Sequence, residues 1–292
     1  MSVDFMIERR LRDLSPELHQ SVIDFTFTLQ GMLDRFRPRF PEFTDHSILH
    51  SLDVLDYSNY IIGEEQINQL SPAECYVLIM ACYLHDIGMG VGEKDYEAFA
   101  RQIDFGNYFD THDRSDTSSV VRAFHHEFSG CLIRKNAKVL EIPSEDLVFA
   151  IIQASRGHRK TDLFDPGEYP EMQTEYGVIR LPYVSAVIRL ADEIDVGANR
   201  NSELLFDTST LTIKRQIEAF GTHESILRVD VTRDKIILVV KPKSPEYVPL
   251  IETLNGKIQE TLDYCRRAAQ ERSNLRITQI RSEIKKIYDA RS

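Results

Sequence analysis

The segment from residue 71 to residue 88 constrains the fold more than any other, because it carries a complete helix-start signal and ends on two chargeable side chains. Its first four residues, SPAE, offer an N-cap serine, a proline at the first helical position and a glutamate placed for a capping box. The segment continues as CYVLIMACYLHDI, which is apolar nearly all round, so this helix is predicted to run through a core. His85 and Asp86 stand at its end, where burial without partners would cost several kcal/mol.

Size, charge and composition restrict the class of protein. The 292 residues suffice for one helical domain with an appendage or for two small domains. A net charge of −11 disfavours duplex nucleic acid as a partner, since sequence-independent binding needs a basic face. The four cysteines match no zinc-knuckle spacing, and Cys75 and Cys82 are predicted to be core residues. We find no apolar leader and no apolar run long enough to span a membrane, so we expect a cytoplasmic protein without a membrane partner.

Up to about residue 200 the pattern is helical. Helices are predicted at 16–33, 45–62, 72–88, 116–139, 144–156 and 183–197. The stretches 90–116 and 160–178 are predicted to be loops, the first with room for one short helix. A loop as long as 90–116 is often a lid in a compact domain.

The residue pattern changes from helical to β-rich after about residue 203. Residues 204–213 and 226–242 are rich in β-formers, and the second stretch alternates about a turn like a β-hairpin. An amphipathic helix is predicted from about residue 246 to residue 270. The predicted fold class is therefore mainly α, with a helical bundle at 1–202 and a smaller α+β region at 203–292. This second region has no assigned function, and it either packs against the bundle or folds alone.

Histidines and aspartates are concentrated in the helical part. Seven of the nine histidines fall between residues 46 and 158, namely His46, His50, His85, His112, His125, His126 and His158. Five successive predicted helices each carry a ligand-type residue: His50, then His85 with Asp86, then His125 or His126, then His158, then Asp192. A helical bundle can point such residues at one internal spot, as helical metal sites do. The alternative is that individual members are ordinary, with Asp192 and Asp195 solvated, and we take His19, His112 and His223 to be ordinary.

Imidazole mixed with carboxylate suits manganese, iron, zinc or magnesium ions. A carboxylate such as Asp86 can bridge two metals about 3.5–4 Å apart, and such a pair activates water and holds phosphoryl oxygens. The cofactor expected from the sequence is therefore divalent metal, with two ions favoured.

Several motifs, in order, resemble the HD superfamily of metal-dependent phosphohydrolases. They are HSLDV at 50–54, ACYLHDIG at 81–88 and RLADEID at 189–195, and the resemblance covers roughly residues 40–200. It implies an HD-type helical bundle whose hallmark metal ligands are His50, His85, Asp86 and Asp192.

The resemblance also implies further roles. His126 and His158 occupy the places of the additional ligands of dinuclear members, with His126 mildly preferred to His125 because neighbouring helical residues point about 100° apart. Asp86, His46 and His125 are the candidate catalytic residues, with His46 similar to the proton-donating histidine of cyclic-nucleotide phosphodiesterases. Candidate phosphate-binding cations near these histidines are Arg122, Arg156, Arg159 and Lys160, each of which could equally be an ordinary surface charge.

The expected function is hydrolysis of a nucleotide or other small phosphorylated compound through a metal-activated water. The residues Ile87-Gly88-Met89 and the lack of a Gly-Tyr-Pro motif depart from the sequence pattern of cyclic-dinucleotide phosphodiesterases. The motifs are closest to HD modules that accompany chaperone-like ATPases. Two alternatives remain: a regulatory or binding module with a structural or degenerate metal site, and a di-iron oxygenase. The oligomeric state, including a homo-oligomer, is left open.

Overall fold

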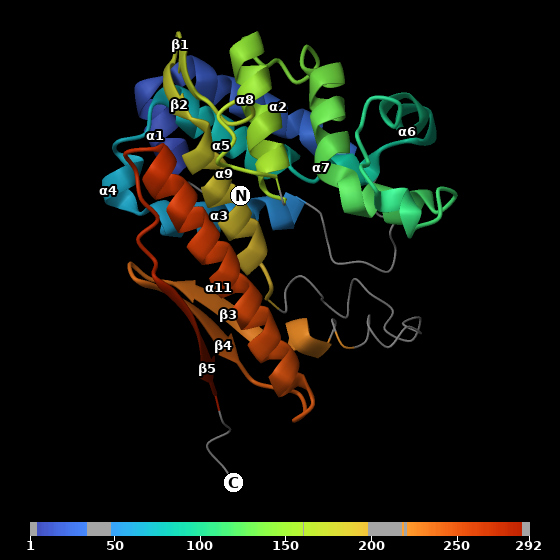
Figure 1. Cartoon of the computed structure of the whole chain (residues 1–292). Helices are drawn as coiled ribbons and strands as arrows, with labels where there is room; N and C mark the ends of the chain where they lie inside the picture. Colours follow the sequence, from blue (N-terminus) through green and yellow to red (C-terminus); the bar gives the residue numbers. More distant parts are fainter. Residues whose placement is uncertain (1–4, 34–47, 160, 198–217, 219–220, 288–292) are drawn as a thin grey trace.

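The structure is a computed structural model that describes residues 5–33, 48–159, 161–197, 218 and 221–287. It is mainly α, with a small α+β region at the C-terminal end (Figure 1), which confirms the predicted fold class. The boundary predicted near residue 203 lies outside the described residues and stays a prediction.

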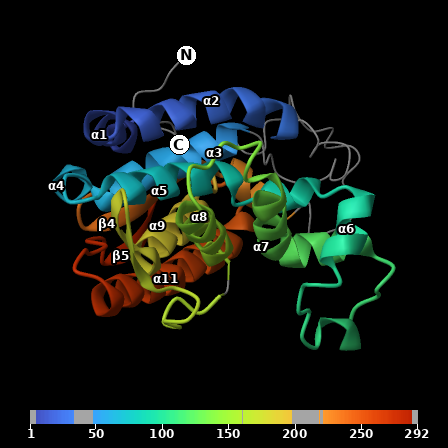
Figure 2. The same cartoon turned by 90° about the horizontal axis from the view of Figure 1, so that it is seen from above.

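A bundle of helices forms the larger part (Figure 2). Its helices are α1 (Met6–Leu14), α2 (Pro16–Leu33), α3 (Ile48–Ile62), α4 (Glu64–Ile67), α5 (Pro72–Leu84), α7 (Thr117–Asn136), α8 (Glu145–Gly157) and α9 (Leu181–Ile194). Every residue of α5 from Ala73 onward is buried, as its all-round apolar sequence predicts. No single described helix is long and apolar enough to span a membrane, although the bent pair Pro72–Gly90 and Glu93–Phe99 passes a test of length and composition alone.

The capping box at the start of α5 is confirmed and extends into a tertiary contact. The Ser71 hydroxyl accepts the Glu74 N–H, and the Glu74 carboxylate accepts the Ser71 N–H. The same carboxylate forms a buried salt bridge with Arg180, with Nη2 and Oε2 2.5 Å apart. Arg180 also donates to the Asn274 side chain at 2.6 Å, so this local signal ties the bundle to the C-terminal region.

Between α5 and α7 the chain forms an arm that projects from the bundle (Figure 1). It contains the 3-10 turns η1 (Ile87–Gly90) and η2 (Tyr108–Asp110) and the helix α6 (Glu93–Phe99). Its aromatic rings pack on Phe124, with ring centroids 4.9 Å away for Phe105 and 5.1 Å for Tyr108. At Phe124 the backbone of α7 leaves helical geometry (φ −119°, ψ 18°), so α7 is kinked directly before the two adjacent histidines.

The predicted loop at 160–178 contains a hairpin that the sequence did not indicate. Strands β1 (Glu171–Thr174) and β2 (Gly177–Arg180) pair antiparallel, with Glu171 opposite Arg180. Gly177, the first residue of β2 after the turn, has φ +107°, a value that L side chains rarely adopt. Strands of four residues without a long apolar alternation leave too weak a pattern to predict.

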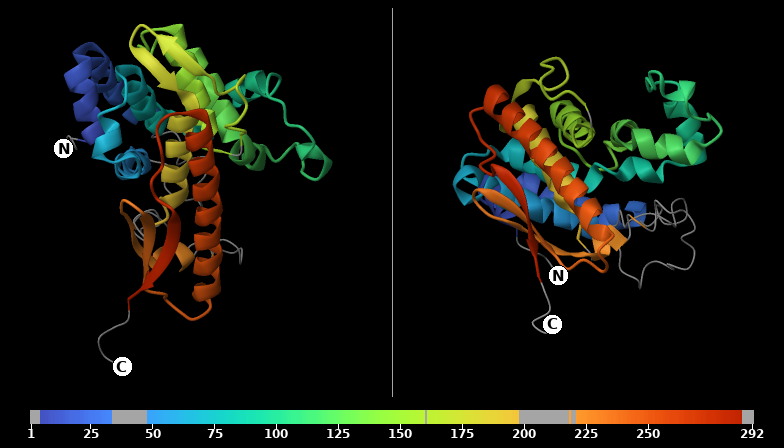
Figure 3. Two further views of the ribbon diagram at one scale, coloured as in Figure 1. Left: turned by 60° about the vertical axis from the view of Figure 1, so that its left-hand side comes forward. Right: turned by 60° about the horizontal axis from the view of Figure 1, so that its bottom comes forward.

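The C-terminal region is a three-stranded sheet beside one long helix (Figure 3). Strands β3 (Ile226–Val231) and β4 (Lys235–Val240) form the predicted antiparallel hairpin, and β5 (Arg281–Lys286), which was not predicted, pairs parallel to β4. Helix α11 (Tyr247–Arg272) lies along α9, where Lys257 Nζ contacts Glu193 Oε1 at 2.8 Å. The region therefore packs on the helix that carries Asp192, while the β-rich stretch 204–213 lies outside the described residues.

Candidate metal centre

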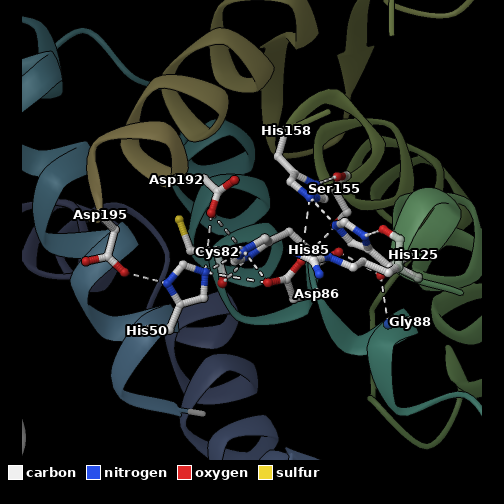
Figure 4. A network of polar contacts seen from close by, with 12 residues as sticks. His50, Cys82, His85, Asp86, Gly88, His125, Ser155, His158, Asp192 and Asp195 are labelled. Atoms are coloured by element: carbon white, nitrogen blue, oxygen red, sulfur yellow. Dashed lines mark hydrogen bonds and ion pairs between the residues drawn. The ribbon is translucent and has the colours of Figure 1, made fainter. Parts of the chain in front are cut away.

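Side chains from five helices, or from their ends, converge in the bundle as two groups of potential metal ligands (Figure 4). The first group is His50, His85 and Asp192, and the second is Asp86, His125 and His158. Within each group the ligand atoms lie within 4.8 Å of one another.

In the first group the histidine nitrogens face each other. His50 Nε2 lies 3.1 Å from His85 Nε2 and 3.4 Å from Asp192 Oδ1. The other ring nitrogen of His50, Nδ1, lies 2.6 Å from Asp195 Oδ2, and the side chains of both residues are 1% exposed. Asp195 is thus buried, and Asp192, which is partly buried, contacts the same histidine rather than standing free on the surface.

In the second group the arrangement is similar. His125 Nε2 lies 2.9 Å from His158 Nε2 and 3.1 Å from Asp86 Oδ1. His158 Nε2 lies 3.6 Å from the same carboxylate oxygen.

Asp86 stands between the two groups and presents one oxygen to each (Figure 4). Its Oδ1 faces His125 and His158, whereas its Oδ2 lies 3.6 Å from His50 Nε2 and 3.5 Å from His85 Nε2. A carboxylate with its two oxygens divided in this way is the donor that a pair of cations would share.

Three of the four histidines use backbone carbonyls freed by an end or a break in a helix. The Nδ1 atoms of His85, His125 and His158 lie 2.5–2.9 Å from the carbonyl oxygen three residues earlier, that of Cys82, Arg122 and Ser155 respectively. His85 and His158 are the C-cap residues of α5 and α8, and His125 follows the kink in α7. Such positions leave carbonyls without a partner inside the helix, so the histidine rings become their partners.

These contacts define what the opposite ring nitrogens can do. A carbonyl or carboxylate oxygen can only accept a hydrogen bond, so Nδ1 of each histidine must carry the proton. Nε2 of each neutral ring then has a free lone pair. Lone pairs facing each other at 2.9 and 3.1 Å repel unless a cation lies among them. Four such nitrogens with the carboxylates of Asp86 and Asp192 make a donor set that fits divalent metal ions.

The electrostatics keep the donors in their ligand forms. Burial lowers the pKa of His85, and burial also lowers the pKa of His158 well below the ordinary value, with help from His85 and His125. Burial alone would raise the pKa of Asp192, but positive charge shared among His50, His158 and His85 would hold it well below the usual range, and a bound divalent ion would supply the same charge. Neutral imidazole and ionised carboxylate are the forms that bind metal.

Ser129 and Gly88 connect the segment that carries His85 and Asp86 to the helix that carries His125. The Ser129 hydroxyl donates to the His85 carbonyl at 2.6 Å and accepts the Gly88 N–H at 2.8 Å. A Cβ on Gly88 would lie 2.1 Å from the His125 carbonyl oxygen, so only glycine allows this approach of η1 to α7. The distance between the His85-Asp86 segment and His125 is thereby set by backbone contact.

The preference for His126 over His125 is reversed in the structure. His125 joins the second group, whereas His126 belongs to neither and its Nε2 lies 3.5 Å from Glu127 Oε1. Burial, His125 and Arg159 lower the pKa of His126 to about 3. The kink at Phe124 decides between the two, because the direction of a side chain after a break cannot be extrapolated from the helix before it. With its Nε2 inside the second group, His125 lies where it could hold a metal ion, and its predicted catalytic role stays a prediction.

The other predicted site residues divide in three ways. His50, His85, Asp86, His158 and Asp192 come together as expected. Arg122 and Arg159 are exposed on the second group's side, but Arg156 is held by Glu127 and Glu168, with guanidinium to carboxylate distances of 2.9 and 3.4 Å. His46 and Lys160 lie outside the described residues.

Two residues of the centre, Asp195 and Ser129, were not predicted from the sequence to be functional. Asp195 follows Asp192 by three residues and Ser129 follows His125 by four, spacings that place side chains on one helix face. That spacing is a usable signal once the ligands are known, but alone it is too common to single them out.

A helical bundle with a buried histidine and aspartate cluster that could hold metal defines the class: this is an HD-domain protein. The profile of the HD-CE family matches residues 40–274, and the chain therefore belongs to the HD-CE family. This range extends beyond the predicted boundary near residue 203 and takes in α11. Searches of curated proteins and of solved structures each returned no match.

Proposed function

We propose that the protein is a metal-dependent phosphohydrolase that acts on a nucleotide or other small phosphorylated compound and uses two divalent ions. HD domains are usually hydrolases. The observation that carries the proposal is the division of the Asp86 oxygens between two histidine pairs. A mononuclear or purely structural site would not need a second pair of lone-pair nitrogens around the other oxygen.

In this proposal His50, His85 and Asp192 would hold one ion, His125 and His158 would hold the other, and Asp86 would be available to both. Bound divalent ions supply Lewis acidity toward a phosphoryl oxygen and lower the pKa of water toward ~7. Asp86 and Asp192 orient the attacking water by accepting its hydrogens. His46 is proposed as the residue that protonates the leaving oxygen, because imidazole serves this purpose near neutral pH.

The arginines near the second group are proposed to differ in role. Arg159 is exposed, follows His158 directly and acts electrostatically on His126, so it is suited to an incoming phosphate. Arg156 already satisfies its charge with Glu127 and Glu168. Arg156 is therefore proposed to be structural.

This assignment predicts that Arg159→Ala raises KM for the substrate by about tenfold, since a hydrogen bond to a charged group contributes about 1.5–3 kcal/mol. Arg156→Ala is the matched control and should leave KM nearly unchanged while lowering the thermal midpoint. Steady-state kinetics and thermal unfolding of both variants check this. Equal effects of the two substitutions on KM would contradict it.

Metal removal tests the function itself. The wild-type protein should contain about two equivalents of divalent metal by mass spectrometry, as a two-ion centre requires. Hydrolysis should disappear after chelation and return when manganese, iron, zinc or magnesium is restored. The panel is nucleoside mono- and triphosphates, followed by phosphate or polyphosphate release, and cyclic and oligonucleotides, followed by formation of the phosphomonoester product. The His85→Ala, Asp86→Ala double variant should lack both metal and activity.

The same samples distinguish the alternatives. Metal-free wild type that stays inactive with every added ion would overturn the enzyme and leave a binding or regulatory module. Turnover that depends on oxygen, without phosphate release, would indicate an oxygenase instead.

A further inference from the structure

We propose that Asp195 is a positioning residue that makes the group of His50, His85 and Asp192 the tighter of the two metal positions. The inference rests on the proposed two-metal centre and adds an order of affinity between its halves. The two positions would then load in sequence, with the second group exchanging its ion more readily.

The observation behind this proposal is a difference in how the histidines are held. His85, His125 and His158 each donate Nδ1–H to a backbone carbonyl of their own helix or segment. His50 instead donates to the carboxylate of Asp195, 145 residues away in the chain, at 2.6 Å.

The position of His50 explains why it differs. His50 is the third residue of α3, and its Nδ1 lies against the carboxylate of Asp195, a residue of another helix end. Asp195 is the C-cap residue of α9, and its N–H donates to the Asp192 carbonyl at 3.3 Å. One helix end thus places Asp192 beside Nε2 of His50 and Asp195 beside Nδ1.

An ionised acceptor changes the ligand more than a carbonyl does. A charge-assisted hydrogen bond is shorter and roughly twice as strong as a neutral one, so it holds the ring in one orientation and one tautomer. It also makes Nε2 a stronger base, and carboxylate partners of metal-bound histidines typically contribute about 10–100-fold to metal affinity.

The charges around the two groups also favour a cation in the first group. The first group has the full charge of Asp192 and the nearby charge of Asp195, both close to His50. The second group shares Asp86 with the first and lies beside His126, on which the exposed Arg159 acts as a positive charge. A divalent cation is therefore bound more strongly in the first group.

The test uses Mn²⁺ alone, with binding measured by equilibrium dialysis and bound metal counted by mass spectrometry. A His158→Ala chain retains the first group, and a His50→Ala chain retains the second. Asp195→Asn preserves an oxygen acceptor for Nδ1–H but removes the charge. We expect it to weaken Mn²⁺ binding by about 10–100-fold in the His158→Ala background.

In the His50→Ala background the same substitution should change affinity by less than about twofold, because Asp195 acts through His50. A merely structural role of Asp195 would weaken binding in both backgrounds alike. Glu193→Gln is the matched control: it removes a neighbouring carboxylate that faces Lys257, and it should leave Mn²⁺ affinity in the His158→Ala background nearly unchanged.

The outcomes separate this inference from the proposed function. Unequal Mn²⁺ sites in the wild type, with the stronger one weakened by Asp195→Asn, support it. Two bound ions of equal affinity, or a tighter site that ignores Asp195→Asn, overturn the inference and leave the two-metal phosphohydrolase intact. A wild-type chain that binds no Mn²⁺ at all overturns the inference, and the proposed function is then decided by whether iron, zinc or magnesium restores activity.

Discussion

Replacing Asp86 by asparagine is expected to lower hydrolysis by about a thousandfold or more, because the two proposed ions would lose their shared ligand and each is worth several kcal/mol in the transition state. Each Asp86 oxygen faces one histidine pair, at distances of 3.1–3.6 Å to the four Nε2 atoms. An amide has one acceptor oxygen and one N–H₂ donor, so the substituted side chain would turn a donor toward one pair. The expected result is a chain with at most one bound metal.

Metal content and phosphate release, measured on the same samples, check this expectation. Asp56→Asn is the matched control, since Asp56 is a partly buried carboxylate on α3, the helix that carries His50, but belongs to neither group. The proposed shared role of Asp86 would be wrong if its variant kept two metal equivalents and near-normal turnover.

Replacing Gly88 by alanine is expected to destabilise the protein by about 3 kcal/mol, at the upper end for overpacking, because the added methyl group meets backbone rather than flexible side chains. Its Cβ would lie 2.1 Å from the His125 carbonyl oxygen and 2.5 Å from the Ser129 nitrogen. Relief requires η1 to move away from α7, which breaks the Gly88 to Ser129 hydrogen bond and separates Asp86 from His125. Metal affinity should therefore fall together with stability.

Urea unfolding of the metal-free protein measures the stability change, and Mn²⁺ dialysis measures the second effect. Gly92→Ala serves as the control four residues along, because a Cβ there meets no heavy atom within 4 Å and the backbone φ is −73°. If both alanine variants unfolded at the same urea concentration as the wild type, the close approach of η1 to α7 would not hold.

Much of the fold follows from local rules. The capping box at Ser71, the proline after it and the apolar run that follows predicted α5 with its burial, since each signal acts within a few residues. Asp116 and Ser144 likewise cap α7 and α8 through their side chains. The sequence alone did not delimit the helices α1 and α4. It also did not predict the strands β1, β2 and β5, which are short or polar and are defined by the partners they pair with.

The choice between His125 and His126 shows where extrapolation along a helix ends. A continuous α7 would relate the two by about 100° and leave only a preference. The break at Phe124, against which Phe105 and Tyr108 pack from the arm, redirects the chain just before the pair. Phe124 contacts both these arm residues and His126 of its own helix, and the arm contacts are not visible from the sequence of α7.

The sequence by itself determined the helical class and the order of the helices that carry potential ligands. It also singled out His50, His85, Asp86, His158 and Asp192 as candidate metal ligands, because residue type and helix signals are local properties. Only the tertiary structure decided that Asp86 divides its oxygens between two groups and that Asp195 supports His50 across 145 residues. The physical reason is that hydrogen bonds and metal ligation depend on distances of about 2–3 Å between atoms, and such distances exist only after the helices have packed.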